Sequence, residues 1–207
     1  MESGENNPFQ VLMQKMQAAA YQWHNYGKTI IGARSDVEQV DIEQLRKFYK
    51  MYYQPDNAVL IISGQFDPAK VLEVIVDAFK DIPRPKRSLP REYTVEPVQD
   101  GERLVVLRRQ GGSPFVASMY HIPPVSDPEF TLLDLAADML GDTPSGRLYR
   151  DIVTEKLGAS VFGFARPMAQ PGYALFGVQL EPTMDAKAAL TALEKSLDSI
   201  HEKPFTE

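Results

Sequence analysis

The chain contains no cysteine and only three histidines among its 207 residues. Without cysteine there can be no disulfide, no thiolate nucleophile and no cysteine-ligated zinc. His24, His121 and His201 lie in separate segments, and none has a histidine or glutamate at the three- or four-residue spacing that sets two ligands on one helix face. We therefore expect no metal site in this sequence. We interpret His24 as a capping or surface residue and His121 as part of a strand.

Long apolar runs and clusters of basic residues are also missing. No run approaches the roughly 20 residues that span a bilayer. The net charge is −6, and the 22 basic residues are spread along the chain among 28 acidic ones, so no basic face is offered to phosphate groups. We expect neither a membrane span nor a nucleic-acid partner. The hydrophobic content of 43% is sufficient for a globular core.

Several stretches combine a capping residue with apolar residues at three- and four-residue steps, which is the pattern of an amphipathic helix. In the second of these, Asp41 and Gln44 have the spacing of a capping box. In the fourth, Gly141 is expected to end the helix. The predicted helices begin at Asn7-Pro8, Asp41, Asp67-Pro68, Ser126, about Ser145 (ending near Leu157) and about Asp185.

Short runs rich in β-branched and aromatic residues predict the strands. Gln110-Gly111-Gly112-Ser113 is expected to join two of them as a hairpin turn. The predicted strands are AVLIIS (58–63), RLVVLRR (103–109), PFVASMYHI (114–122), SVFGFA (160–165) and YALFGVQL (173–180).

After Ile82 the composition changes to prolines and charges without a sustained period, which is typical of an extended linker. A strand, an acidic-Pro turn, Ala-Lys and an amphipathic helix occur in that order both before and after it. We leave open whether this is a true repeat. Two similar α+β units separated by a linker is the simplest interpretation.

One stretch imitates a phosphate-binding loop. Gly141 and Gly146 have the glycine spacing of a P-loop, but Arg147 replaces its lysine and Leu148 replaces its magnesium-binding hydroxyl. A P-loop also follows a strand, whereas the residues before Gly141 have helical periodicity. We interpret the stretch as a helix end followed by a turn.

Two further groups invite a functional interpretation. Glu2 and Glu5 are candidates for a general acid and base pair, but acids near a helix N-terminus are favoured by the dipole alone. Tyr49, Tyr52 and Tyr53 suggest a stacking platform, yet their helical spacing predicts that at least two of them are core residues. We expect neither group to be catalytic.

The order of motifs resembles one known family. YGKTIIGARSDVEQVDIEQLRKFYKMYYQPDNAVLIISGQFD is similar to the middle of a pitrilysin-type (M16) zinc metallopeptidase, with its Tyr-Tyr-x-Pro-x-Asn turn. DPEFTLLDLAADMLGDTPSGRLYRDIVTEKLGASVFGFA resembles the helix, glycine loop, Arg-Leu helix and strand of that family's next unit. The resemblance implies an α+β fold with mostly antiparallel sheets and helices packed on one face. It also implies residues 1–84 as the second half of one unit, 85–101 as a linker and 102–207 as the first half of a second, non-catalytic unit.

The zinc-binding motif of this family has no counterpart in this sequence. In the family, His-x-x-Glu-His and a distal glutamate bind zinc, and the motif glutamate activates water. This sequence contains no His-x-x-Glu-His. The distal glutamate is expected immediately before Met1, with Glu2 as a nearby candidate. The implied function is a non-catalytic portion of a peptide-hydrolysing zinc endopeptidase, with zinc in the parent protein and none in this fragment. The alternative is a fragment of an inactive scaffold or interaction subunit.

Overall fold

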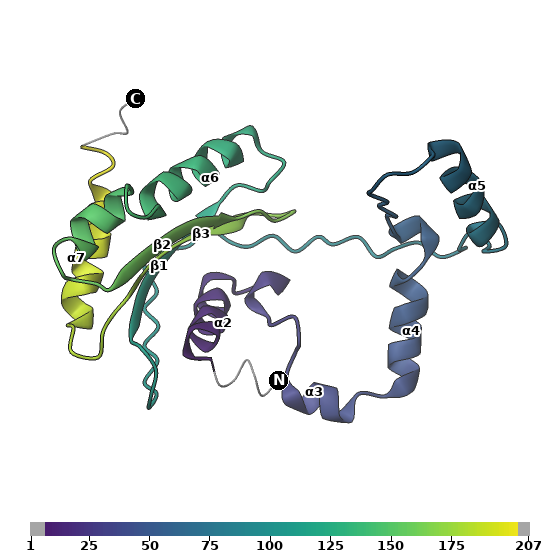
Figure 1. Cartoon of the computed structure of the whole chain (residues 1–207). Helices are drawn as coiled ribbons and strands as arrows, with labels where there is room; N and C mark the ends of the chain where they lie inside the picture. Colours follow the sequence, from purple (N-terminus) through teal and green to yellow (C-terminus); the bar gives the residue numbers. More distant parts are fainter. Residues whose placement is uncertain (1–6, 203–207) are drawn as a thin grey trace. The chain divides into compact units, whose positions relative to one another are not determined.

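The computed structural model describes residues 7–202, which form two compact units (Figure 1). The sheet unit consists of residues up to Lys28 together with those from Glu96 onward. The helical unit, Thr29–Val95, is inserted between these two parts of the sheet unit. None of the helices described in residues 7–202 is long and apolar enough to cross a bilayer.

The sheet unit is built on three antiparallel strands, β1 (Phe115–Ile122), β2 (Ser160–Arg166) and β3 (Gly172–Gln179). The spatial order is β1-β3-β2, so β3 is central and nearly all of its residues are buried. Leu175 of β3 pairs with Met119 on one side and with Phe164 on the other. These strands confirm three of the predicted strands and the α+β fold class.

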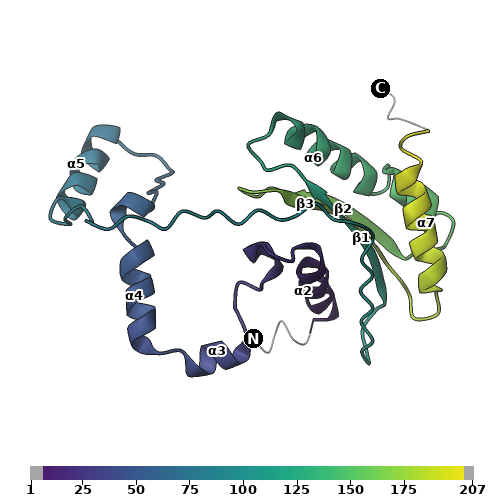
Figure 2. The same cartoon turned by 180° about the vertical axis from the view of Figure 1, so that it is seen from behind.

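Helices lie on both faces of this sheet (Figures 1 and 2). The main core lies between one face and helices α6 (Pro128–Gly141) and α7 (Ala186–Asp198), together with the π-helical turn η3 (Tyr149–Val153). Helix α2 (Pro8–Ala20) packs on the opposite face, where its apolar side chains meet Leu175 and Tyr173. A short 3-10 turn, η1 (Asn25–Gly27), follows α2.

The helical unit contains α3 (Arg34–Gln39), α4 (Ile42–Tyr52), the 3-10 turn η2 (Pro55–Asn57) and α5 (Pro68–Phe79). The side chain of Asp41 accepts the Glu43 N–H at the start of α4, and that of Asp67 accepts the Ala69 N–H at the start of α5. These contacts confirm the two predicted N-caps. No residue between Thr29 and Val95 is buried, so the apolar faces expected to be internal are exposed.

Two predicted strands are wrong in this structure. Residues 58–63 and 103–109 belong to no strand ladder among the described residues. A strand is stable only when its N–H and C=O groups pair with a neighbour, and the helical unit contains no other strand for residues 58–63. The glycine turn before β1 does have the positive φ angles expected of it, 79° at Gly111 and 80° at Gly112.

The helix predicted over about 145–157 is also wrong in extent. Thr154 N–H bonds to Tyr149 O at 3.2 Å and Leu157 N–H to Ile152 O at 2.9 Å, so the segment forms one wide π-helical turn. Lys156, with a φ of 59°, lies just beyond it. The cap of α6 is Asp127, which accepts the Glu129 N–H at 2.9 Å, and not Ser126 as predicted.

Candidate functional site

The three histidines do not form a metal site: the rings of His24 and His121 both neighbour that of Tyr21, and His201 lies beyond α7. Within residues 7–202 there is no group of three or more His, Cys, Asp or Glu side chains that could hold a metal ion. His24 caps η1, where its Nδ1 accepts the Tyr26 N–H at 3.2 Å; its capping role is confirmed, but the residue is buried rather than on the surface. His121 lies in β1 with its ring 4.8 Å from that of Tyr21, and His201 is exposed beyond α7. Glu2 and Glu5 lie outside the described residues.

The stretch that imitates a P-loop has a packing role. Gly141 is the last residue of α6, so the stretch follows a helix and not a strand. Leu148 is completely buried in the main core. A Cβ added at Gly141 would lie 2.5 Å from the Cα of Gly163 on β2, so the glycine allows the helix to contact the strand backbone.

The tyrosines of α4 differ from their prediction. Tyr49 and Tyr53 stack with ring centroids 4.9 Å apart and an interplanar angle of 15°, and both are exposed. Tyr52, which contacts Phe48 at 4.6 Å between centroids, is half-buried. The expectation that at least two of the three are core residues is therefore wrong, because no second layer of this unit covers α4.

The helical unit exposes much more apolar surface than a self-contained domain of its size would. The run Val59–Ile62 is exposed throughout, with 87% of Val59 and 83% of Ile61 accessible. The apolar faces of α4 and α5 are equally open, and we call these residues together the apolar docking surface. It comprises Ile42, Leu45, Phe48, Tyr49, Tyr53, Val59, Leu60, Ile61, Ile62, Phe66, Leu72, Val74, Val76 and Phe79.

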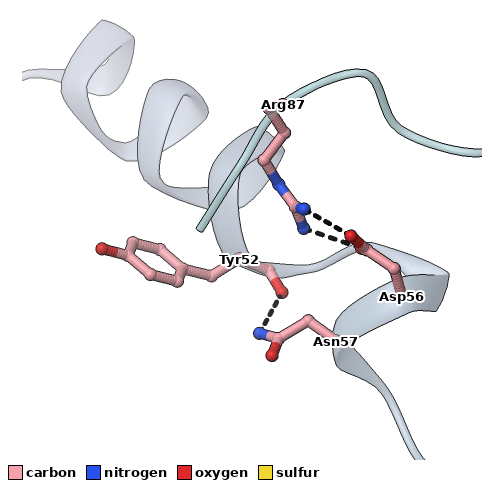
Figure 3. Close-up of polar contacts among 4 residues, drawn as sticks. All are labelled: Tyr52, Asp56, Asn57 and Arg87. Atoms are coloured by element: carbon pink, nitrogen blue, oxygen red, sulfur yellow. Dashed lines mark hydrogen bonds and ion pairs between the residues drawn. The ribbon is translucent and has the colours of Figure 1, made fainter. Parts of the chain in front are cut away.

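A bidentate ion pair ties the Pro-rich segment to the turn after α4. The two terminal nitrogens of Arg87 donate to the two carboxylate oxygens of Asp56 at 2.6 and 2.9 Å, and Asn57 Nδ2 donates to the Tyr52 carbonyl at 2.9 Å (Figure 3). The hydrogen bonds from Arg87 hold the pKa of Asp56 below its ordinary value. The Tyr-Tyr-x-Pro-x-Asn turn of the sequence is thus joined to the following linker.

In the sheet unit, Glu96 binds the chain just beyond the end of α2. Its Oε1 accepts the Gln22 N–H at 2.7 Å, and its Oε2 accepts the N–H groups of Trp23 and His24, each at 2.9 Å. Three successive amides thus converge on one carboxylate, as in an anion-binding nest. Desolvation raises the pKa of Glu96, but the three N–H bonds outweigh it, so the pKa lies below its ordinary value.

Arg103 completes this arrangement from the same segment. Its Nη1 donates to the carbonyls of Ala19 and Ala20 at 2.5 and 3.3 Å, and α2 has no basic residue of its own in its last turn. A cation here is favoured by the helix dipole and satisfies carbonyls that lack a partner within the helix. We call Glu96, Arg103 and the backbone of residues 19–24 the α2 clasp.

The charges of the α2 clasp affect the pKa of the neighbouring His121. Burial lowers the pKa of His121, and Arg103 lowers it further while Glu96 acts in the opposite direction. Tyr21 is buried beside it and donates from its hydroxyl to the Pro171 carbonyl at 3.2 Å. The clasp therefore joins α2, the segment returning from the helical unit, β1 and the loop before β3.

A mainly apolar cavity of about 530 Å³ opens at the other end of α2. Phe9 of α2, Phe115 of β1, and Phe162 and Phe164 of β2 line it. Phe9 contacts Phe115 and Phe162 with ring centroids 5.5 and 5.6 Å apart. The cavity is wide open to solvent. Neither the cavity nor the α2 clasp was predicted from the sequence.

Comparison with known proteins gives consistent matches. The family model described as Peptidase M16 inactive domain matches residues 39–207. The chain is 28% identical over 202 residues to the zinc protease PqqE of Helicobacter pylori, covering 96% of this chain and 45% of that protein. It is similar to the crystal structure of a protease from Helicobacter pylori, with a TM-score of 0.91, 26% identity, and coverage of 99% of this chain and 50% of that one.

The same fold occurs in a chain of complex III2 from Candida albicans, with a TM-score of 0.80 and 15% identity, over 100% of this chain and 50% of that one. The chain thus spans about half the length of the relatives that it matches.

Proposed function

Because the chain belongs to the Peptidase M16 inactive-domain family, we propose that it is the non-catalytic portion of a zinc-dependent endopeptidase that hydrolyses peptides. Similarity to proteins named zinc proteases supports this assignment. The observation that carries it is the combination of this family match with a sequence that has no His-x-x-Glu-His motif.

In this proposal, the residues that cleave the peptide belong to a part of the parent protein that this sequence does not include. The described residues do not fit a zinc ion, since they bring no three potential ligands together. In the parent, zinc would activate water for attack on the peptide carbonyl. The role of this chain is to form part of the chamber that holds the substrate, where extended peptides can pair with sheet edges.

The division into homologous halves is part of the same proposal. Residues 1–84 belong to the second half of one M16-like unit, 85–101 form a linker, and 102–207 belong to the first half of the next unit. The apolar docking surface supports this division, because a half unit lacks the elements that would cover its apolar faces. The unpaired run Ala58–Ser63 would then extend a sheet of the parent protein.

A second candidate is a part of an inactive scaffold or interaction subunit. It is favoured by the complex III2 chain, which has the same fold in a structure that is described as an assembly and not as a protease. The chamber-wall and scaffold functions differ in one respect: only the first requires zinc in the parent.

The test measures zinc content and cleavage of a quenched fluorescent peptide for the full-length parent and for the 207-residue chain. We expect about one zinc per parent and chelator-sensitive cleavage, with neither in the chain alone. A parent without zinc or cleavage would support the scaffold function. Stoichiometric zinc in the 207-residue chain, lost on Glu2→Gln, would overturn both assignments.

A further inference from the structure

Two segments of the sheet unit come together where the helical unit is inserted. Residues 22–28 lead from α2 toward Thr29, and residues 96–101 return from Val95. We call these two segments the neck. In sequence they are separated by the whole helical unit, so only non-covalent contacts hold them side by side within the sheet unit.

Glu96 makes the contacts that join the two segments. It is the first residue of the returning segment, and its carboxylate accepts three successive backbone N–H groups of the outgoing segment at 2.7 to 2.9 Å. Hydrogen bonds to an ionised acceptor are about twice as strong as neutral ones. These amides lie beyond the end of α2 at Ala20, so they do not continue the helical hydrogen-bond pattern, and the Glu96 carboxylate is their acceptor.

Arg103, a few residues farther along the chain, bonds the carbonyls of Ala19 and Ala20. The Arg103 guanidinium therefore bonds carbonyls in the last turn of α2, and the Glu96 carboxylate bonds the amides just beyond it. Arg103 stabilises the helix end itself, whereas Glu96 bonds the residues beyond α2 that lead to the helical unit. Tyr26, farther along the outgoing segment, is held separately by the sheet unit, where its hydroxyl accepts the Gln170 N–H at 3.2 Å.

We propose that Glu96 is the latch of this neck: its carboxylate, bound to the amides of residues 22–24, keeps the outgoing and returning segments together, and its loss opens the neck while the sheet stays folded. This contact fixes the distance between the two segments through which the helical unit is connected to the sheet unit. The proposal does not depend on peptidase activity.

The distance across the neck is a direct measure of the latch. Because the chain has no cysteine, Lys28→Cys and Val98→Cys introduce two unique sites for spin labels, both in exposed positions. Pulsed electron resonance on the full 207-residue chain then gives the distribution of distances between them. We expect a narrow distribution with Glu96 present and a broader, longer one for Glu96→Ala, with Glu96→Gln between the two.

The matched control is Glu102→Gln, an exposed glutamate directly after the returning segment, which removes the same charge and should leave the distribution narrow. Hydrogen exchange provides the second readout. In Glu96→Ala the amides of Gln22, Trp23 and His24 should exchange at least about tenfold faster, whereas the amides of β3, such as Leu175 and Val178, should keep their protection.

An unchanged distance distribution in Glu96→Ala would overturn the proposal. If that variant also loses protection in β3, Glu96→Gln is decisive because it keeps the shape of the side chain. The latch then requires that Glu96→Gln opens the neck with β3 protected, and an equal loss of protection in both places would show that Glu96 serves the general stability of the fold instead.

Discussion

Gly141 on α6 and Gly163 on β2 meet backbone to backbone. A Cβ added at Gly141 would lie 2.5 Å from Gly163 Cα, and one added at Gly163 would lie 2.8 Å from the Ala137 carbonyl oxygen and 3.1 Å from Gly141 Cα. These neighbours are main-chain atoms, which cannot rotate away as a side chain can, and at Gly163 the ring of Phe176 is also within 2.8 Å. The helix can pack this closely on the sheet only if both positions lack a side chain.

Replacing either glycine should therefore destabilise the sheet unit. We expect Gly141→Ala or Gly163→Ala to lower the free energy of unfolding by about 2 kcal/mol through overpacking, as measured by chemical denaturation. Gly101→Ala is the control, because a Cβ there meets nothing within 4 Å, and its effect should be no more than about 0.5 kcal/mol. Equal losses at Gly141 and Gly101 would contradict the close approach.

The Arg87 pair should protect the linker from proteases. Arg87→Lys keeps the charge but cannot donate two parallel hydrogen bonds to Asp56, so the segment around it should be released more often. We expect limited proteolysis within residues 85–95 to become several times faster, with the difference shrinking at high salt. Arg91→Lys, at an exposed arginine of the same segment, should leave the rate unchanged. Equal acceleration in both variants would refute a specific role for the pair.

The exposed run Val59–Ile62 should drive self-association of the isolated chain. It combines high β propensity with unpaired backbone, which is the profile of an edge that pairs with other chains. Ile61→Lys should reduce concentration-dependent light scattering. Val98→Lys places the same charge on a residue that is 89% exposed in the other unit and should have little effect. A similar reduction by both variants would indicate a general effect of charge.

Local signals in the sequence predicted the starts of α2, α4, α5 and α7, but not helix α3 (Arg34–Gln39). Asn7, Asp41, Asp67 and Asp185 each accept a hydrogen bond from an N–H two or three residues later, so the cap and its partner lie within one short stretch of chain. Such contacts need no knowledge of the rest of the fold. Gly141 was likewise expected to end α6, which it does, but its contact with Gly163 depends on the sheet and has no local signal.

The remaining features depend on partners that are distant in sequence. Residues 58–63 have strand propensity, but no described strand lies beside them, and propensity alone does not supply a ladder. Tyr49 was expected to be internal because helical spacing identifies an apolar face and not what covers it. Glu96 binds amides 72 to 74 residues away, and a glutamate that bonds backbone leaves no recognisable pattern at either end.

Acid should open the latch at a pH below the usual range for glutamate. The folded pKa of Glu96 is lowered, so its stabilising contribution is fully present above the ordinary value of about 4.3 and is lost as the pH falls through the lower folded value. His121, which faces it from β1, also has a lowered pKa, so its contribution already begins to fade below about 6.5. Arg103 stays charged throughout.

The fluorescence of Trp23 provides a direct signal for the protonation of Glu96. It is the only tryptophan of the chain, and its backbone N–H donates to the Glu96 carboxylate while its side chain is 66% exposed. We expect tryptophan fluorescence to change in an acid transition below pH 4.3, and we expect Glu96→Gln to show part of that change already at pH 7. His121→Gln should remove the loss of stability that begins below about pH 6.5 and keep the low-pH transition, because that variant leaves the carboxylate on its three amides. A low-pH transition that persists unchanged in Glu96→Gln would belong to another carboxyl group and would exclude Glu96 as its cause.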